Sequence, residues 1–147
     1  MSTAIHRRVA ACRAGTDPTL IARLPSGWAV MGDPQVLAGY CLLLPDPVVP
    51  HLNAMPAAAQ AAFLADLARL GQAVLDVTGA IRINYAVFGN LEPALHGHVH
   101  PRYADEPEAL RAAHPWAYDW SAARRFDPQT DGPVLAALRT RLTAPQT

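Results

Sequence analysis

The sequence predicts an α+β fold with a mainly antiparallel sheet. Its strand candidates are short, are joined by hairpin-like connections, and outnumber the long helices. No internal repeat is present, and no linker marks a boundary between two domains. The 147 residues match the length of one ordinary domain, so we expect a single domain that spans residues 1–147.

The first part of the chain predicts one short helix and three strands. Residues 1–15 are typical of a helix that ends at a glycine. Strand candidates follow at residues 19–23 and 28–31, and a Pro-Ser-Gly turn separates them. A buried strand is expected at residues 38–44, and the four prolines from Pro45 to Pro56 indicate a stiff loop after it.

The clearest element is an amphipathic helix over residues 56–77. Its apolar face repeats at spacings of three and four residues, through Phe63, Leu67, Leu70, Val74 and Val77. Polar residues such as Asp66 fall largely off this face. Gly79 is well suited to end the helix.

The remaining sequence predicts two further strands, an aromatic segment and a last helix. Residues 81–88 alternate and are rich in β-branched and aromatic side chains, and a further strand is expected at residues 96–100. The aromatic residues of segment 116–120 alternate as a strand or an extended arm would present them. Packing in the core or in a dimer is the simplest interpretation of these rings, and stacking on a base is the alternative. A helix is expected over residues 133–142.

Composition excludes several classes of protein. Twelve basic and twelve acidic residues cancel, so no basic surface for nucleic acid is expected. All twelve basic residues are arginines, which excludes Schiff-base chemistry and the phosphate-binding lysine of a P-loop. Two cysteines, Cys12 and Cys41, cannot form a disulfide framework or a four-cysteine zinc site. The N-terminus lacks the apolar region of a signal peptide, and no apolar stretch approaches the length of a membrane span, so we expect a cytoplasmic protein.

Three of the six histidines, His96, His98 and His100, lie within five residues of one another. Alternate residues of a strand share one face, so all three rings should project the same way. Such a row suits two chemistries. Imidazoles can bind a metal ion if other residues complete the ligand set. Alternatively, one ring can attack a phosphate ester as a nucleophile while its neighbours stabilise charge on the phosphoryl oxygens.

The segment from Ile83 to Tyr103, INYAVFGNLEPALHGHVHPRY, resembles the signature of the histidine triad (HIT) superfamily, in which histidines alternate with apolar residues and a Pro-Arg pair often follows. The segment from Gly39 to Pro45, GYCLLLP, resembles the strand that precedes the long helix in these proteins. The resemblance covers about residues 15–103. It implies a HIT-like five-stranded sheet with one long helix and short flanking helices, and leaves residues 104–147 as a C-terminal extension.

Two alignments with the motif are open. One makes His96, His98 and His100 the triad, but it places the Pro-Arg pair too early. The alignment anchored on the Pro-Arg pair matches Ala94, His96 and His98 to the three motif positions, and we favour it. It implies that His96 is the catalytic nucleophile and that His98 is the catalytic, phosphate-binding histidine. It also implies that alanine replaces the first motif histidine, whose hydrogen bonds support the other two.

Other polar residues are candidates for substrate binding. Asn84 and Asn90 lie where HIT proteins place contacts to ribose and phosphate; the alternatives are a satisfied amide in a strand and a simple turn residue. His100 is an extra imidazole, and it is a candidate for substrate binding if it lies on the same face of the strand as His96 and His98. Arg102 either neutralises a phosphate or braces the sheet edge by pairing with a carboxylate, and we favour bracing. His114 is expected to be a surface residue.

By this resemblance, we expect a hydrolase or nucleotidyl transferase that acts at the α-phosphate of a nucleotide through a covalent nucleotidyl-histidine. The implied substrates are dinucleoside polyphosphates or nucleoside phosphoramidates. HIT proteins are usually homodimers without a cofactor, so we expect a homodimer, a nucleotide partner, no cofactor and no metal. Two alternatives remain: a nucleotide-binding protein with little or no activity, because position 94 is alanine, and a metalloprotein that uses the histidine row.

Overall fold

One five-stranded sheet forms the centre of the molecule. The computed structural model, which describes residues 2–146, orders the strands β1-β2-β3-β5-β4, and each neighbouring pair is antiparallel. The strands are β1 (Leu20–Leu24), β2 (Gly27–Met31), β3 (Cys41–Pro45), β4 (Arg82–Val87) and β5 (Gly97–Arg102). The predicted α+β class with a mainly antiparallel five-stranded sheet is therefore confirmed. This order leaves β4 at one edge and places β5 between β3 and β4.

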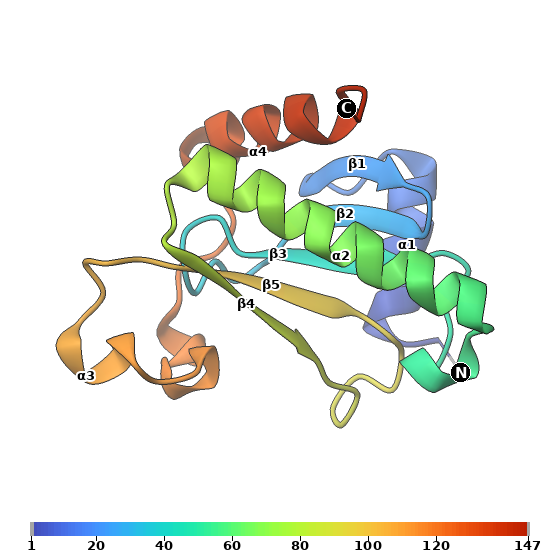
Figure 1. Cartoon of the computed structure of the whole chain (residues 1–147), viewed down its shortest axis with the longest axis horizontal. Coiled ribbons are helices and arrows are strands. Elements are labelled where there is room, and N and C mark those ends of the chain that lie inside the picture. The colour runs from blue at the N-terminus through green and yellow to red at the C-terminus, as the bar shows by residue number, and fades with distance from the viewer. Residues whose placement is uncertain (1, 147) are drawn as a thin grey trace.

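Helices cover both faces of the sheet. They are α1 (Ala4–Ala14), α2 (Ala57–Thr78), α3 (Glu108–Arg111) and α4 (Pro128–Thr143), with 3-10 turns η1 (Leu52–Ala54), η2 (Pro115–Ala117) and η3 (Trp120–Ala122). Figure 1 shows α2 and α4 over one face, and α1 packs against the other. Within residues 2–146, no helix is long and apolar enough to cross a membrane.

The predicted helix boundaries follow from local capping. Thr3 accepts a hydrogen bond from the His6 N–H at the start of α1, and Gly15 ends this helix with a φ of 70°. Pro56 precedes α2, and Gly79 ends it, also with a φ of 70°. Both glycines occupy the left-handed region that other residues rarely adopt, so the helices end where the sequence predicts.

Alternation along β3 divides the core into two clusters. Cys41 and Leu43 pack with α2 and α4, whereas Leu42 and Leu44 pack with α1 on the opposite face. This is the period of two that a strand imposes on its side chains. Because β3 is buried on both faces, its sequence is a continuous apolar run.

Asp66 departs from the expected helix pattern. It is buried in α2, and its carboxylate accepts a hydrogen bond of 2.7 Å from the Ser26 N–H. Ser26 lies in the turn between β1 and β2, so this carboxylate ties that turn to the long helix. A backbone N–H that becomes buried needs an acceptor, which explains why a charged residue occupies this position.

One expectation for the C-terminal part is wrong, and another is right about the helix but wrong about where it begins. Segment 116–120 is neither a strand nor an extended arm, because η2 and η3 fold it into two short turns. The last helix begins at Pro128 rather than near residue 133, because the Asp127 side chain caps it by accepting a hydrogen bond from the Gln129 N–H. Pro133, at which the sequence pattern begins the helix, lies inside it instead.

Candidate active site

The three histidines project from one face of the sheet, as predicted. His98 and His100 lie in β5 and His96 directly precedes it. The ring centroids of His96 and His98 are 4.8 Å apart, and those of His98 and His100 are 5.6 Å apart. The intervening Gly97 faces α2, since a Cβ atom there would lie 2.6 Å from the Leu67 side chain.

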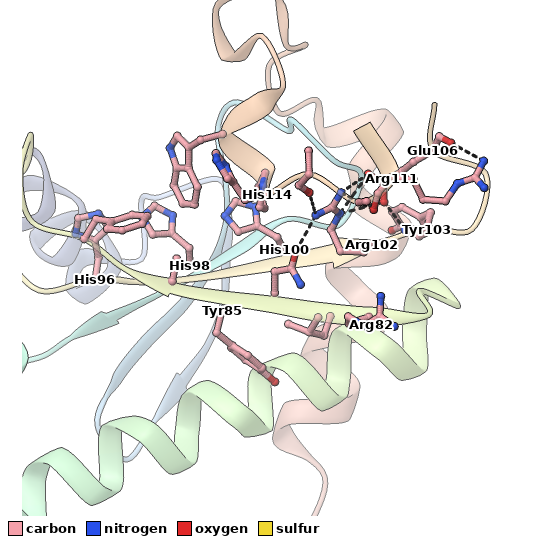
Figure 2. Close-up of a pocket in the computed structure, with 18 of the residues that line it drawn as sticks. Arg82, Tyr85, His96, His98, His100, Arg102, Tyr103, Glu106, Arg111 and His114 are labelled. Carbon is pink, nitrogen blue, oxygen red and sulfur yellow. Dashed lines mark hydrogen bonds and ion pairs between the residues drawn. The ribbon is translucent and has the colours of Figure 1, made fainter. Parts of the chain in front are cut away.

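These rings line a cavity of about 1220 Å³ (Figure 2). β4 and β5 form its floor, and the loop after β4 and the segment around η2 form its walls. The lining includes all five residues expected in the site, namely Asn84, Asn90, His96, His98 and His100. The fold thus places in one cavity residues that lie up to 16 positions apart in the sequence, from Asn84 to His100.

His96 is held in one tautomer by the backbone. Its Nδ1 lies 2.7 Å from the carbonyl oxygen of Ala94. A carbonyl oxygen only accepts hydrogen bonds, so Nδ1 carries the hydrogen and the Nε2 of the neutral ring has a free lone pair. This Nε2 makes no hydrogen bond within the described residues and is not among their buried, unpartnered polar atoms, so it remains accessible to the cavity.

His98 is held by a different partner. Its Nδ1 lies 2.6 Å from the hydroxyl oxygen of Tyr40, which comes from the residue before β3. Burial, together with the neighbouring His96, lowers the pKa of His98 to about 4, so the ring is neutral at pH 7. Like that of His96, its Nε2 remains accessible to the cavity.

His100 has no exposed surface. Its ring stacks on Tyr40 with centroids 4.5 Å apart, and Trp116 and Trp120 meet it edge-on. Neither ring nitrogen has a hydrogen-bond partner within the described residues. Burial, with smaller effects from His98 and Arg102, lowers the pKa of His100 to about 3. Direct contact with a substrate stays a prediction, and it requires these aromatic rings to move.

Buried Arg102 and half-buried Asn84 form a polar group at the other end of the cavity. The Arg102 guanidinium bonds both carboxylate oxygens of Glu106 at 3.0–3.2 Å and donates a 2.7 Å hydrogen bond to the Asn84 side-chain oxygen. This geometry favours the bracing interpretation of Arg102 over phosphate neutralisation. The Asn84 side-chain oxygen is thereby satisfied, and contact of this residue with a substrate stays a prediction. Asn90 is exposed at the rim, where its predicted contact is equally untested.

Sequence reasoning missed three features of this cavity. Tyr40 lies in the strand expected at residues 38–44, but the local sequence does not predict its contact with His98; the signal for this contact is a tyrosine in an otherwise apolar run. Trp116 lies against His98, with ring centroids 5.1 Å apart, and is both a packing and a cavity residue. His114 is exposed as expected, yet it also lines the cavity.

The metal-binding alternative finds no support in this geometry. Within residues 2–146, no group of three or more histidine, cysteine, aspartate or glutamate side chains is placed to hold a metal ion. Both cysteines are buried and free.

Neither known protein-family models nor curated protein sequences match this chain. Solved structures do match. A histidine triad protein from Bradyrhizobium japonicum is 23% identical, with a TM-score of 0.73 over 88% of this chain and 94% of its own. A histidine triad protein from Marinobacter aquaeolei is 19% identical, with a TM-score of 0.75 over 97% of each chain. A hypothetical histidine triad nucleotide-binding protein from Sulfolobus tokodaii is 11% identical, with a TM-score of 0.72 over 91% of this chain and 89% of its own.

The chain therefore has the histidine triad fold. The resemblance expected from the INYAVFGNLEPALHGHVHPRY segment is confirmed at the level of the fold, by proteins whose sequences are at most 23% identical.

Proposed function

We propose that this protein is a nucleotide hydrolase or nucleotidyl transferase in which His96 attacks the α-phosphate of the substrate. The observation that carries this proposal is the hydrogen bond from His96 Nδ1 to the Ala94 carbonyl, which leaves the Nε2 lone pair free in a cavity of about 1220 Å³. A nucleophilic imidazole needs this arrangement, with one nitrogen held and the other unprotonated and accessible. The histidine triad fold supports the proposal.

The first step forms a bond between His96 Nε2 and phosphorus and breaks the bond from phosphorus to the leaving group, which departs with the electron pair. The histidine ring becomes cationic because it keeps its Nδ1 hydrogen. The Ala94 carbonyl then accepts a charge-assisted hydrogen bond, which stabilises the intermediate. Attack by water on phosphorus breaks the N–P bond, releases the nucleoside monophosphate and one proton, and restores neutral His96.

Charge in the cavity is compatible with an anionic substrate. Arg82 and Arg111 line it and, among the described residues, form no ion pair with a carboxylate. The Glu106 carboxylate is already neutralised by Arg102. We propose that His98 donates a hydrogen bond from Nε2 to a phosphoryl oxygen, and that Asn84 and Asn90 contact the sugar and phosphate.

The test is incubation with an adenosine phosphoramidate and a dinucleoside polyphosphate, each labelled at the α-phosphate. We expect product release and, after rapid quenching, label on the protein that is lost in acid. His96→Ala should abolish both signals, whereas His51→Ala, which changes an exposed histidine outside the cavity, should change neither. Equal turnover by the His96→Ala and unsubstituted proteins would refute the proposal.

A nucleotide-binding protein without turnover is the second candidate, and Ala94 is the observation that favours it. The Ala94 side chain is fully buried in the core beside α1 and offers no hydrogen bond to the histidines. Calorimetric binding of adenosine monophosphate, with no turnover of either substrate above, would select this candidate.

We further propose that the protein is a homodimer that pairs along the edge strand β4. Within residues 2–146, one side of β4 has no neighbouring strand, and exposed apolar side chains lie along β4 and beyond its ends: Ile81, Tyr85, Val87, Phe88 and Leu91. An antiparallel edge can pair with its own copy about a two-fold axis, which would cover this surface. Light scattering should give twice the mass of the chain, and Val87→Asp should shift it to that of a monomer. A monomer at micromolar concentration without substitution would contradict the proposal.

A further inference from the structure

The geometry points to Tyr40 as the positioning residue of His98: its hydroxyl donates to Nδ1 and thereby holds His98 with its hydrogen on Nε2, directed to the cavity. The inference begins with the contact of 2.6 Å between the Tyr40 hydroxyl oxygen and His98 Nδ1. The consequence for catalysis rests on the function proposed above, but the hydrogen bond itself does not.

The direction of this hydrogen bond follows from the surroundings of Tyr40. The residue is 3% exposed, and His98 is the only hydrogen-bond partner of its hydroxyl within the described residues. If His98 Nδ1 donated, the phenol hydrogen would be left buried without an acceptor, which costs about 1–3 kcal/mol. If the phenol donates its hydrogen to His98 Nδ1, no buried hydrogen at this contact lacks an acceptor. Burial also raises the pKa of Tyr40, which keeps the hydroxyl protonated.

The position of the Tyr40 ring is fixed from several sides. A Cβ atom at Gly32 would lie only 2.2 Å from the ring, so the ring packs directly on the glycine backbone. His100 stacks in parallel with the same ring at 4.5 Å, and Trp120 meets it edge-on at 5.4 Å. A ring held in this way presents its hydroxyl at one place, and His98 is oriented accordingly.

The two histidines in the cavity are thus held in opposite tautomers. His96 donates from Nδ1 to a carbonyl and keeps a lone pair on Nε2, whereas His98 accepts at Nδ1 and keeps a hydrogen on Nε2. The first arrangement suits a nucleophile and the second a donor to a phosphoryl oxygen. Alanine at position 94 cannot supply a side-chain hydrogen bond. The residue that orients His98 is instead Tyr40, which directly precedes β3, the strand adjacent to β5.

The direct test is the tautomer of His98, measured by long-range proton–nitrogen NMR of the full chain labelled with nitrogen-15 at histidine. The resonances are assigned by comparison with His98→Gln. We expect a single Nε2–H form at pH 7 in the unsubstituted protein. Tyr40→Phe keeps the ring against Gly32 and removes only the hydroxyl, so the Nε2–H and Nδ1–H forms should then be averaged.

Tyr118→Phe is the matched control, because it removes a hydroxyl that bonds Glu106 instead of a histidine. It should leave the His98 resonances unchanged. With a hydrolysable nucleotide, Tyr40→Phe should lower kcat roughly tenfold to a hundredfold, as loss of an orienting partner does for metal-binding histidines. KM should change little, because the donor acts mainly on the transition state.

An Nδ1–H form in the unsubstituted protein, or an unchanged His98 spectrum in Tyr40→Phe, would overturn the inference. The unsubstituted spectrum decides the matter even if Tyr40→Phe does not fold. Absence of turnover by the unsubstituted protein counts against the proposed function, while the NMR result still decides how Tyr40 acts on His98.

Discussion

His100 should make the folded protein sensitive to mild acid, and His100→Leu should remove part of that sensitivity. Burial lowers the pKa of His100 from 6.5 to about 3, so between these values the unfolded chain takes up a proton that the folded chain does not. Falling pH therefore favours unfolding across this window. Each pH unit below 6.5 costs the folded protein about 1.4 kcal/mol, so the cost at pH 5 is about 2 kcal/mol.

Leucine is apolar and close to histidine in size, so it can occupy the enclosure formed by Tyr40, Trp116 and Trp120. At pH 7 the variant should be at least as stable as the unsubstituted protein. It loses ring stacking worth about 0.5–1.5 kcal/mol, but it no longer buries two unpartnered nitrogens, each of which costs about 1–3 kcal/mol. On going from pH 7 to pH 5, its advantage in the free energy of unfolding should widen by about 2 kcal/mol.

Urea unfolding of both proteins at pH 7, 6 and 5, followed by circular dichroism, measures this difference. His51→Leu is the matched control, because it replaces an exposed histidine and its difference from the unsubstituted protein should not change with pH. A constant difference between His100→Leu and the unsubstituted protein across the three pH values would refute the reasoning.

Two further predictions concern stability. Arg102→Leu should destabilise the fold by about 3–5 kcal/mol in urea unfolding, because it leaves the buried Glu106 carboxylate without its cation; an effect below 1 kcal/mol would count against this ion pair. Gly27→Ala should prevent normal pairing of β2 with β3, because the new Cβ would lie 2.0 Å from the Leu44 carbonyl oxygen, whereas Gly132→Ala meets nothing within 4 Å and should be neutral or slightly stabilising in thermal melting. Equal melting temperatures for the two alanine variants would contradict this packing.

Most of the fold could be predicted because it depends on short-range patterns. The helix ends at Gly15 and Gly79 follow from backbone conformations that glycine adopts most easily, and the shared face of His96 and His98 follows from the period of a strand. The C-terminal part was harder to predict. Segment 116–120 alternates like a strand, but its rings pack against the histidines in short turns, and this contact is not visible in the local sequence.

The candidate site, too, could be predicted from the sequence only in part. The sequence by itself determined that three imidazoles share one surface of the sheet and that no lysine takes part in the chemistry. Only the tertiary structure decided which imidazole is held by a carbonyl, which one by Tyr40, and which one is enclosed with no hydrogen-bond partner among residues 2–146. The physical reason is that the direction of side chains along a strand is a property of the backbone, whereas hydrogen bonding and burial depend on groups that come from distant segments.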